Sequence, residues 1–196
     1  MLVLITLTET EKSLLNELKH SSSETYFHSL RVKNLAVRMI SFMQTSHTAD
    51  FSRRDTDIIC KGALLHDIGK LYTKNVVLTK ASSLSETERE HMKSHTRRGY
   101  EAICGEFSED EREILTNILL YHHERVDGSG YEHRTDLPLY VQIVAICDVF
   151  DAIHSDRSYH DGLKTPECLK VIRERKGGTF DKAIIDCLEQ ATKSIE

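Results

Sequence analysis

Apolar residues recur at helical spacing along most of this chain of 196 residues. In residues 23–44 they fall close to the i, i+3, i+4, i+7 rule for one face of an α-helix. Further helices are expected at 9–19, 55–68, 86–105, 109–123, 136–156, 165–176 and 181–194. Two prolines and nine glycines leave few places for the tight turns of a β-rich fold. The pattern predicts an all-α fold, a single helical bundle of about seven or eight helices.

Two segments lack the helical repeat and are expected to be loops. Residues 72–84 should form an ordered loop, and the SETE sequence at 85–88 fits a capping box that begins the next helix. The other loop, 124–135, contains two of the nine glycines. No change in composition marks a second domain, so we divide the chain only into an N-terminal helical extension (1–20) and one main domain (21–196).

Charge and cysteine content limit the classes of partner. The formal net charge of −5 argues against binding of long nucleic acid, because no basic excess exists to neutralise a phosphate backbone. The five cysteines are scattered and form no C-x-x-C pair, which favours reduced thiols over a disulfide or zinc framework. The first twelve residues are too short to span a bilayer and do not resemble a signal peptide. We therefore expect a cytoplasmic protein without a membrane partner.

Eleven histidines are the unusual feature of the composition, and most lie beside acidic residues. A solvated histidine at a helix end, or a hydrogen-bonded carboxylate such as Asp148 in an apolar run, would explain each position by itself. Five expected helices, however, each place a histidine or carboxylate at an apolar-to-polar boundary. In a small bundle this conjunction predicts a di-metal site. Imidazole and carboxylate ligands without thiolate favour iron or manganese over zinc.

Four segments resemble the HD-domain metallohydrolases. HDIGK at 66–70 is similar to the family signature, and HHERVDGSGYE at 122–132 is similar to the HHExxDGxGYP signature of the HD-GYP subfamily. KSHTRRGYEAI at 93–103 and ICDVFDAIHSDRSY at 146–159 resemble two further segments of that subfamily. The resemblance spans about residues 24–185, and it implies that the main domain is an HD-type helical bundle.

The resemblance also implies two or three divalent metal ions and a set of ligands with imidazole or carboxylate side chains. The implied ligands are His28, His66, Asp67, His95, His122, His123 and Asp148, with Glu24 at a position that helps to hold a third metal in some members. His91 does not match the motif and is expected at the surface. Asp151 is expected to be a hydrogen-bond partner rather than a ligand, and Cys147 to be a packing residue.

A mechanism follows from these ligands. Asp67 would bridge two metals that hold a water between them, and the two cations would lower the pKa of that water to give hydroxide near neutral pH. Lys70 would stabilise charge on the phosphate in the transition state; the alternative is a solvated lysine after a helix end. Arg157 matches a phosphate-binding arginine that can form a bidentate contact.

The chain departs from the subfamily pattern at two positions. Glu132 stands where the Gly-Tyr-Pro motif has proline, and it adds a negative charge close to the expected anionic ligand. His160 stands where the subfamily often has a second phosphate-binding lysine, and it either contacts the substrate or points into solvent. Both changes weaken anion binding and leave the metal ligands intact.

The leading hypothesis is a metal-dependent phosphodiesterase that hydrolyses a cyclic dinucleotide, cyclic di-GMP or a related one. One alternative is a phosphohydrolase for another nucleotide. A second alternative is a non-catalytic module that binds a nucleotide or a signalling protein without turnover. The complete ligand set argues against the second alternative, since degenerate members lose ligands first.

Overall fold

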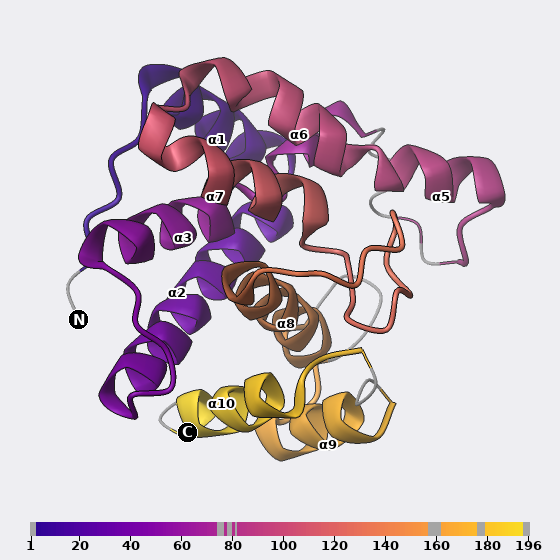
Figure 1. The fold of residues 1–196 in the computed structure, drawn as a ribbon. Coiled ribbons are helices and arrows are strands. Elements are labelled where there is room, and N and C mark those ends of the chain that lie inside the picture. The colour runs from indigo at the N-terminus through magenta and orange to yellow at the C-terminus, as the bar shows by residue number, and fades with distance from the viewer. Residues whose placement is uncertain are drawn as a thin grey trace.

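The computed structural model describes residues 3–73, 77, 80, 82–156, 162–175 and 179–193, and within them it contains helices and no strand. The elements in chain order are α1 (Glu9–Ser21), α2 (Ser23–Thr45), α3 (Arg53–Leu65), η1 (Ile68–Tyr72), α5 (Glu86–Lys93), α6 (His95–Ile103), η2 (Cys104–Glu106), α7 (Glu109–Tyr121), α8 (Leu139–His154), α9 (Thr165–Arg175) and α10 (Lys182–Thr192). Helix α2 contacts α1, α3, α8 and α10, so it runs through the centre of the bundle (Figure 1). The all-α prediction is confirmed.

Capping boxes fix the N-termini of four helices. In each, a serine or threonine side chain accepts a hydrogen bond from the third helical N–H, and the acidic side chain at that position accepts one from the cap. The pairs are Thr8–Glu11, Ser52–Asp55, Ser85–Glu88 and Ser108–Glu111. The capping box predicted at 85–88 is therefore confirmed.

Two predicted helix boundaries were wrong. The single helix expected over 86–105 is broken at Ser94, whose hydroxyl donates to the carbonyl of His91 and whose backbone connects α5 to α6. The helix expected from residue 136 begins at Leu139 because Pro138 precedes it and holds the chain in an extended conformation. Of the 13 residues in the loop predicted at 72–84, six lie outside the described residues.

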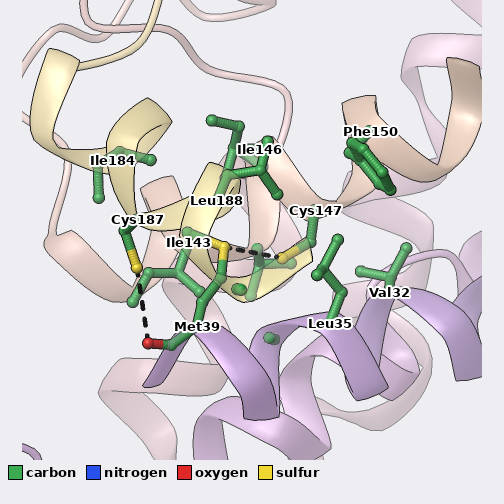
Figure 2. Close-up of a cluster of buried hydrophobic side chains, with 14 of the residues drawn as sticks. Val32, Leu35, Met39, Ile143, Ile146, Cys147, Phe150, Ile184, Cys187 and Leu188 are labelled. Carbon is green, nitrogen blue, oxygen red and sulfur yellow. Dashed lines mark hydrogen bonds between the residues drawn. The ribbon is translucent and has the colours of Figure 1, made fainter. Parts of the chain in front are cut away.

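Two apolar clusters form the core. The larger one joins α2, α8 and α10 around Met39, which is fully buried. Cys147 donates its S–H to the Met39 sulfur at 3.5 Å, and Cys187 donates to the Met39 carbonyl at 3.6 Å (Figure 2). Burial raises the pKa of Cys147 well above its usual value, as expected of a packing residue. All five cysteines are free thiols.

The second cluster joins α1, α3, α6 and α7 and includes Leu18, Leu65 and Ile68. Its position matters because the dipeptide His66–Asp67 lies between two of its members, Leu65 and Ile68. In the part of the chain that the structure describes, no helix combines the length and the apolar character needed to cross a bilayer.

Candidate metal centre

Five parts of the chain place histidine or aspartate side chains close together inside the bundle. Helix α2 supplies His28, the turn after α3 supplies His66 and Asp67, α6 begins at His95, α7 is followed by His122 and His123, and α8 carries Asp148. All are buried except His123, which is partly exposed. Six of these residues form two groups in which the ligand atoms all lie within 4.8 Å of one another: Asp67, His95, His122 and His123, and His28, His66 and Asp67.

Asp67 belongs to both groups, and its two oxygens point to different partners. The Oδ2 atom lies 3.4 Å from His66 Nε2 and 3.6 Å from His28 Nε2. The Oδ1 atom lies 3.4 Å from His95 Nε2. A carboxylate placed in this way can ligate one cation with each oxygen. Asp148 makes a similar pair of approaches, with Oδ1 3.0 Å from His28 Nε2 and Oδ2 3.8 Å from His123 Nδ1.

Three of the histidines are oriented by main-chain carbonyls. A carbonyl oxygen can only accept a hydrogen bond, so the Nδ1 atom of each ring must carry the proton and its Nε2 atom presents a lone pair to the cluster. The bonds run from His66 to Ala63 O (2.8 Å), from His95 to Met92 O (2.6 Å) and from His122 to Ile118 O (3.0 Å). This is the tautomer that a metal site with Nε2 ligands requires.

Two buried atoms at the centre make no hydrogen bond to any described residue: His66 Nε2 and Asp67 Oδ1. Leaving such a group unsatisfied costs about 1–3 kcal/mol, and more where it is charged. Both atoms are acceptors directed into the cluster, so a cation would satisfy them. The residues present therefore fit a divalent metal ion.

A second layer of side chains holds His28. Its Nδ1 atom donates to Asp151 Oδ2 at 2.7 Å, as the sequence predicted for this aspartate. Arg31 donates to both Asp151 oxygens, from Nε at 2.7 Å and from Nη2 at 3.0 Å, and Ser155 donates to Oδ1 at 3.0 Å. Burial favours the neutral acid, but the bonds from His28 and Arg31 outweigh it and lower the pKa of Asp151 to about 2. Sequence analysis did not single out Arg31, although its i, i+3 spacing from His28 places both on one helix face.

The electrostatics give the centre the protonation states of metal ligands. Burial lowers the pKa of His95 to about 4 and lowers those of His122 and His123 well below the usual value. Burial would raise the pKa of Asp67, but Lys70 and His66 hold it well below its usual range. His28 behaves differently: burial opposes protonation, but hydrogen bonds to Asp148 and Asp151 raise its pKa. At neutral pH, His95, His122 and His123 are therefore neutral imidazoles that face the charged carboxylates of Asp67 and Asp148, as metal binding requires.

The loop after α7 covers one side of the centre and is organised by Glu124. This buried carboxylate accepts the backbone N–H of Glu132 at 2.8 Å through Oε1 and that of Arg134 at 2.8 Å through Oε2. A Cβ at Gly130 would lie 2.5 Å from the Glu124 Cα, so only glycine allows this approach. The Tyr131 ring then stacks on His123, with centroids 4.5 Å apart and planes at 33°. This role of Glu124 is not among the predictions made from the sequence.

The remaining predicted residues differ in where they lie relative to the two groups. Lys70, on η1, donates to Asp67 Oδ2 at 2.6 Å. Glu24 is exposed one turn before His28 and belongs to neither group. His91 is partly exposed. Arg157 and His160 lie outside the described residues.

A model of the HD domain family matches residues 25–153, well over half of the chain. The chain belongs to the HD domain family. The six residues of the two groups lie within the matched span, as does Asp148.

The chain is similar to curated relatives and to a solved structure. The chain is 37% identical over 150 residues to the cyclic di-GMP phosphodiesterase response regulator RpfG of Xanthomonas campestris pv. campestris, covering 74% of this chain and 39% of that protein. It is 30% identical over 193 residues to the 3'3'-cGAMP-specific phosphodiesterase 2 of Vibrio cholerae, covering 95% and 36%. The chain thus spans less than half the length of these relatives. The fold is similar to that of Bd1817, an HDG"Y"P protein from Bdellovibrio bacteriovorus, with a TM-score of 0.67, 21% identity and coverage of 86% and 52%.

Proposed function

We propose that this HD domain is a metal-dependent phosphodiesterase that hydrolyses a cyclic dinucleotide, cyclic di-GMP or a related one. The observation that carries the proposal is the shared position of Asp67, whose two oxygens face two different groups of inward-directed imidazoles. Two neighbouring cation positions linked by one carboxylate suit the hydrolysis of a phosphodiester.

The proposed ligands are His28, His66, Asp67, His95, His122, His123 and Asp148, with iron or manganese as the metal, because the set contains imidazole and carboxylate but no thiolate. Glu24 is proposed as a ligand of a third ion only, since its exposed side chain lies outside both groups. Bound metal would supply an activated water and positive charge for the phosphoryl oxygens.

The side chains around these ligands have separate roles in the proposed reaction. Asp151 and the three main-chain carbonyls hold the imidazoles so that their Nε2 atoms face the cluster of proposed metal ligands. Lys70 places a positive charge beside Asp67 and stabilises the negative charge that builds on the phosphate in the transition state. Arg157 and His160 are proposed to bind phosphate on the grounds of the sequence resemblance alone.

The choice of substrate is supported by the two curated relatives, which are named as phosphodiesterases of cyclic di-GMP and of 3'3'-cGAMP. A signalling protein is proposed as a further partner because the first of them is named a response regulator. The five free cysteines support a cytoplasmic location.

The test combines metal analysis with a substrate screen. Protein loaded anaerobically with Fe²⁺ or Mn²⁺ should hold about two metal ions per chain and convert cyclic di-GMP or 3'3'-cGAMP to a linear product separated by chromatography. His66→Ala and Asp67→Ala should remove metal and activity together, whereas His20→Ala, at an exposed histidine on α1, should change neither. Less than about half an equivalent of metal, without activation by added ions, would refute the proposal. If the protein hydrolyses only other nucleotides, the proposal that its substrate is a cyclic dinucleotide is wrong.

A further inference from the structure

Lys93, the last residue of α5, places a positive charge at the rim of the candidate metal centre. Its Nζ atom lies 5.7 Å from the centroid of the Tyr131 ring, and that ring stacks on His123. The lysine side chain is 41% exposed, so its ammonium group is accessible from solvent. A cation is therefore held next to the centre, outside the cluster of imidazoles.

The backbone of Lys93 is fixed with respect to the centre. The carbonyl of the preceding residue, Met92, accepts the Nδ1 hydrogen of His95 at 2.6 Å. Helix α5 itself has no buried residue and projects from the bundle, with its C-terminal end beside the loop that follows α7 (Figure 1). The anchor at Met92 thus sets where Lys93 starts, although the rest of α5 is loosely packed.

The side chain of Lys93 can change partners at little cost. It forms an ion pair with Glu90 Oε1 at 2.7 Å, in which the Glu90 side chain is 64% exposed. Exposed ion pairs one helical turn apart contribute little to the free energy of folding, because water and salt screen both charges. The Tyr131 ring supports the ammonium group by a cation–π contact that does not use its hydrogen-bond donors.

We propose that Lys93 binds the second phosphate of the cyclic dinucleotide, the phosphodiester that is not being hydrolysed. The inference rests on the proposed function and assigns a further substrate contact to the same site. A cyclic dinucleotide carries two phosphodiesters with one negative charge each, and the metal centre with Lys70 engages one of them. The second needs a cation at the rim, where the exposed Glu132 adds a negative charge. In the sequence, His160 stands where the resemblance has a phosphate-binding lysine. On binding, Lys93 exchanges the Glu90 carboxylate for the phosphate.

Calorimetric titration can test this contact with a hydrolysis-resistant substrate. The probe is a cyclic di-GMP or cyclic GMP-AMP analogue with a phosphorothioate at both linkages, added to protein fully loaded with Mn²⁺. Lys93→Gln should weaken binding by about 5- to 30-fold, the effect of losing one charge-assisted hydrogen bond, and Lys93→Arg should restore most of it. Glu90→Gln should tighten binding by about twofold, because it removes the competing carboxylate. The control is Lys12→Gln, at an exposed lysine in a matching i, i+3 pair with Glu9 on α1, and it should have no effect.

A second probe, the linear dinucleotide GpG, has a single phosphodiester and no terminal phosphate. Lys93→Gln should leave its affinity unchanged, whereas loss of affinity for both probes would show that the lysine does not act on the second phosphate. Equal binding of the cyclic probe by Lys93→Gln and by wild-type protein would overturn the inference and leave the proposed function intact. Metal loss in Lys93→Gln would also overturn it, because the role would then be structural. If wild-type protein neither binds nor hydrolyses any cyclic dinucleotide, the proposed function fails and the inference with it.

Discussion

Gly69→Ala should disrupt the candidate metal centre, although it replaces none of the proposed metal ligands. A Cβ at this position would lie 1.9 Å from the carbonyl oxygen of His95 and 2.5 Å from the backbone nitrogen of Gly99. Both are backbone atoms of α6, so no side-chain rotation can relieve the contact. The His95 oxygen would have to retreat by about 1.5 Å to reach the 3.4 Å at which ordinary contact begins. His95 lies on α6, and Asp67 directly precedes η1. This shift therefore separates His95 Nε2 from Asp67 Oδ1, which lie 3.4 Å apart.

The expected loss of stability is about 3 kcal/mol, at the upper end of the range for overpacking, since the backbone itself must move. Gly99→Ala should cost at most about 1 kcal/mol, because its Cβ meets the Gly69 nitrogen at 3.0 Å and alanine favours the helix. Gly105→Ala, with no atom within 4 Å of the new Cβ, should leave stability unchanged or slightly raised. Urea unfolding in the presence of a chelator measures these differences.

Metal titration of the same three variants tests the consequence for the site. Gly69→Ala should bind Mn²⁺ at least about 10-fold more weakly, in line with the effect of displacing a supporting group, and Gly105→Ala should bind as wild type does. If Gly69→Ala unfolds at the same urea concentration as Gly105→Ala and retains full metal affinity, the close contact between η1 and α6 does not set the geometry of the centre.

Four further results are expected. Lys61→Met should lower the free energy of unfolding by about 3–5 kcal/mol, because it removes the ammonium group that lies 2.9 Å from the buried Glu11 carboxylate and 3.2 Å from that of Glu111. A loss below about 1 kcal/mol in urea unfolding would contradict this. Arg31→Met should weaken Mn²⁺ binding by about 10-fold or more through the loss of its two bonds to Asp151, and Arg31→Lys should recover only part of it. Lys70→Ala should lower kcat by about 10²-fold while metal content stays unchanged, and loss of metal would show a structural role instead. Because burial lowers the pKa of His95 to about 4, the unfolded chain binds a proton on this residue between about pH 6.5 and pH 4 and the native chain does not. The free energy of unfolding of the metal-free protein should therefore fall as the pH is lowered through this range. In urea unfolding, His95→Gln should reduce the slope of that free energy against pH by about 1.4 kcal/mol per pH unit.

The sequence predicted the features that depend on local pattern. Helical periodicity located most helices, and the motifs identified the histidines and carboxylates that the structure brings together. The break at Ser94 was missed because the apolar repeat continues across it, and only a side-chain bond to a carbonyl interrupts the helix. Arg31 was missed for a different reason: its partner Asp151 is 120 residues away in the chain. The same limit applies to Lys93, whose place beside Tyr131 follows from the path of a loop that no repeat describes.

The main-chain anchors of His66, His95 and His122 affect how the centre can change by mutation. A carbonyl group is present whatever side chain a residue carries, so substitutions at Ala63, Met92 or Ile118 that preserve the backbone keep these three rings in place. His28 is different, because its ring is held by the side chain of Asp151. A single nucleotide change in the codon of Asp151 can therefore release the His28 ring while the other three rings stay oriented. If a relative of this protein loses its activity during evolution, we expect the first losses at His28 on α2 and Asp151 on α8.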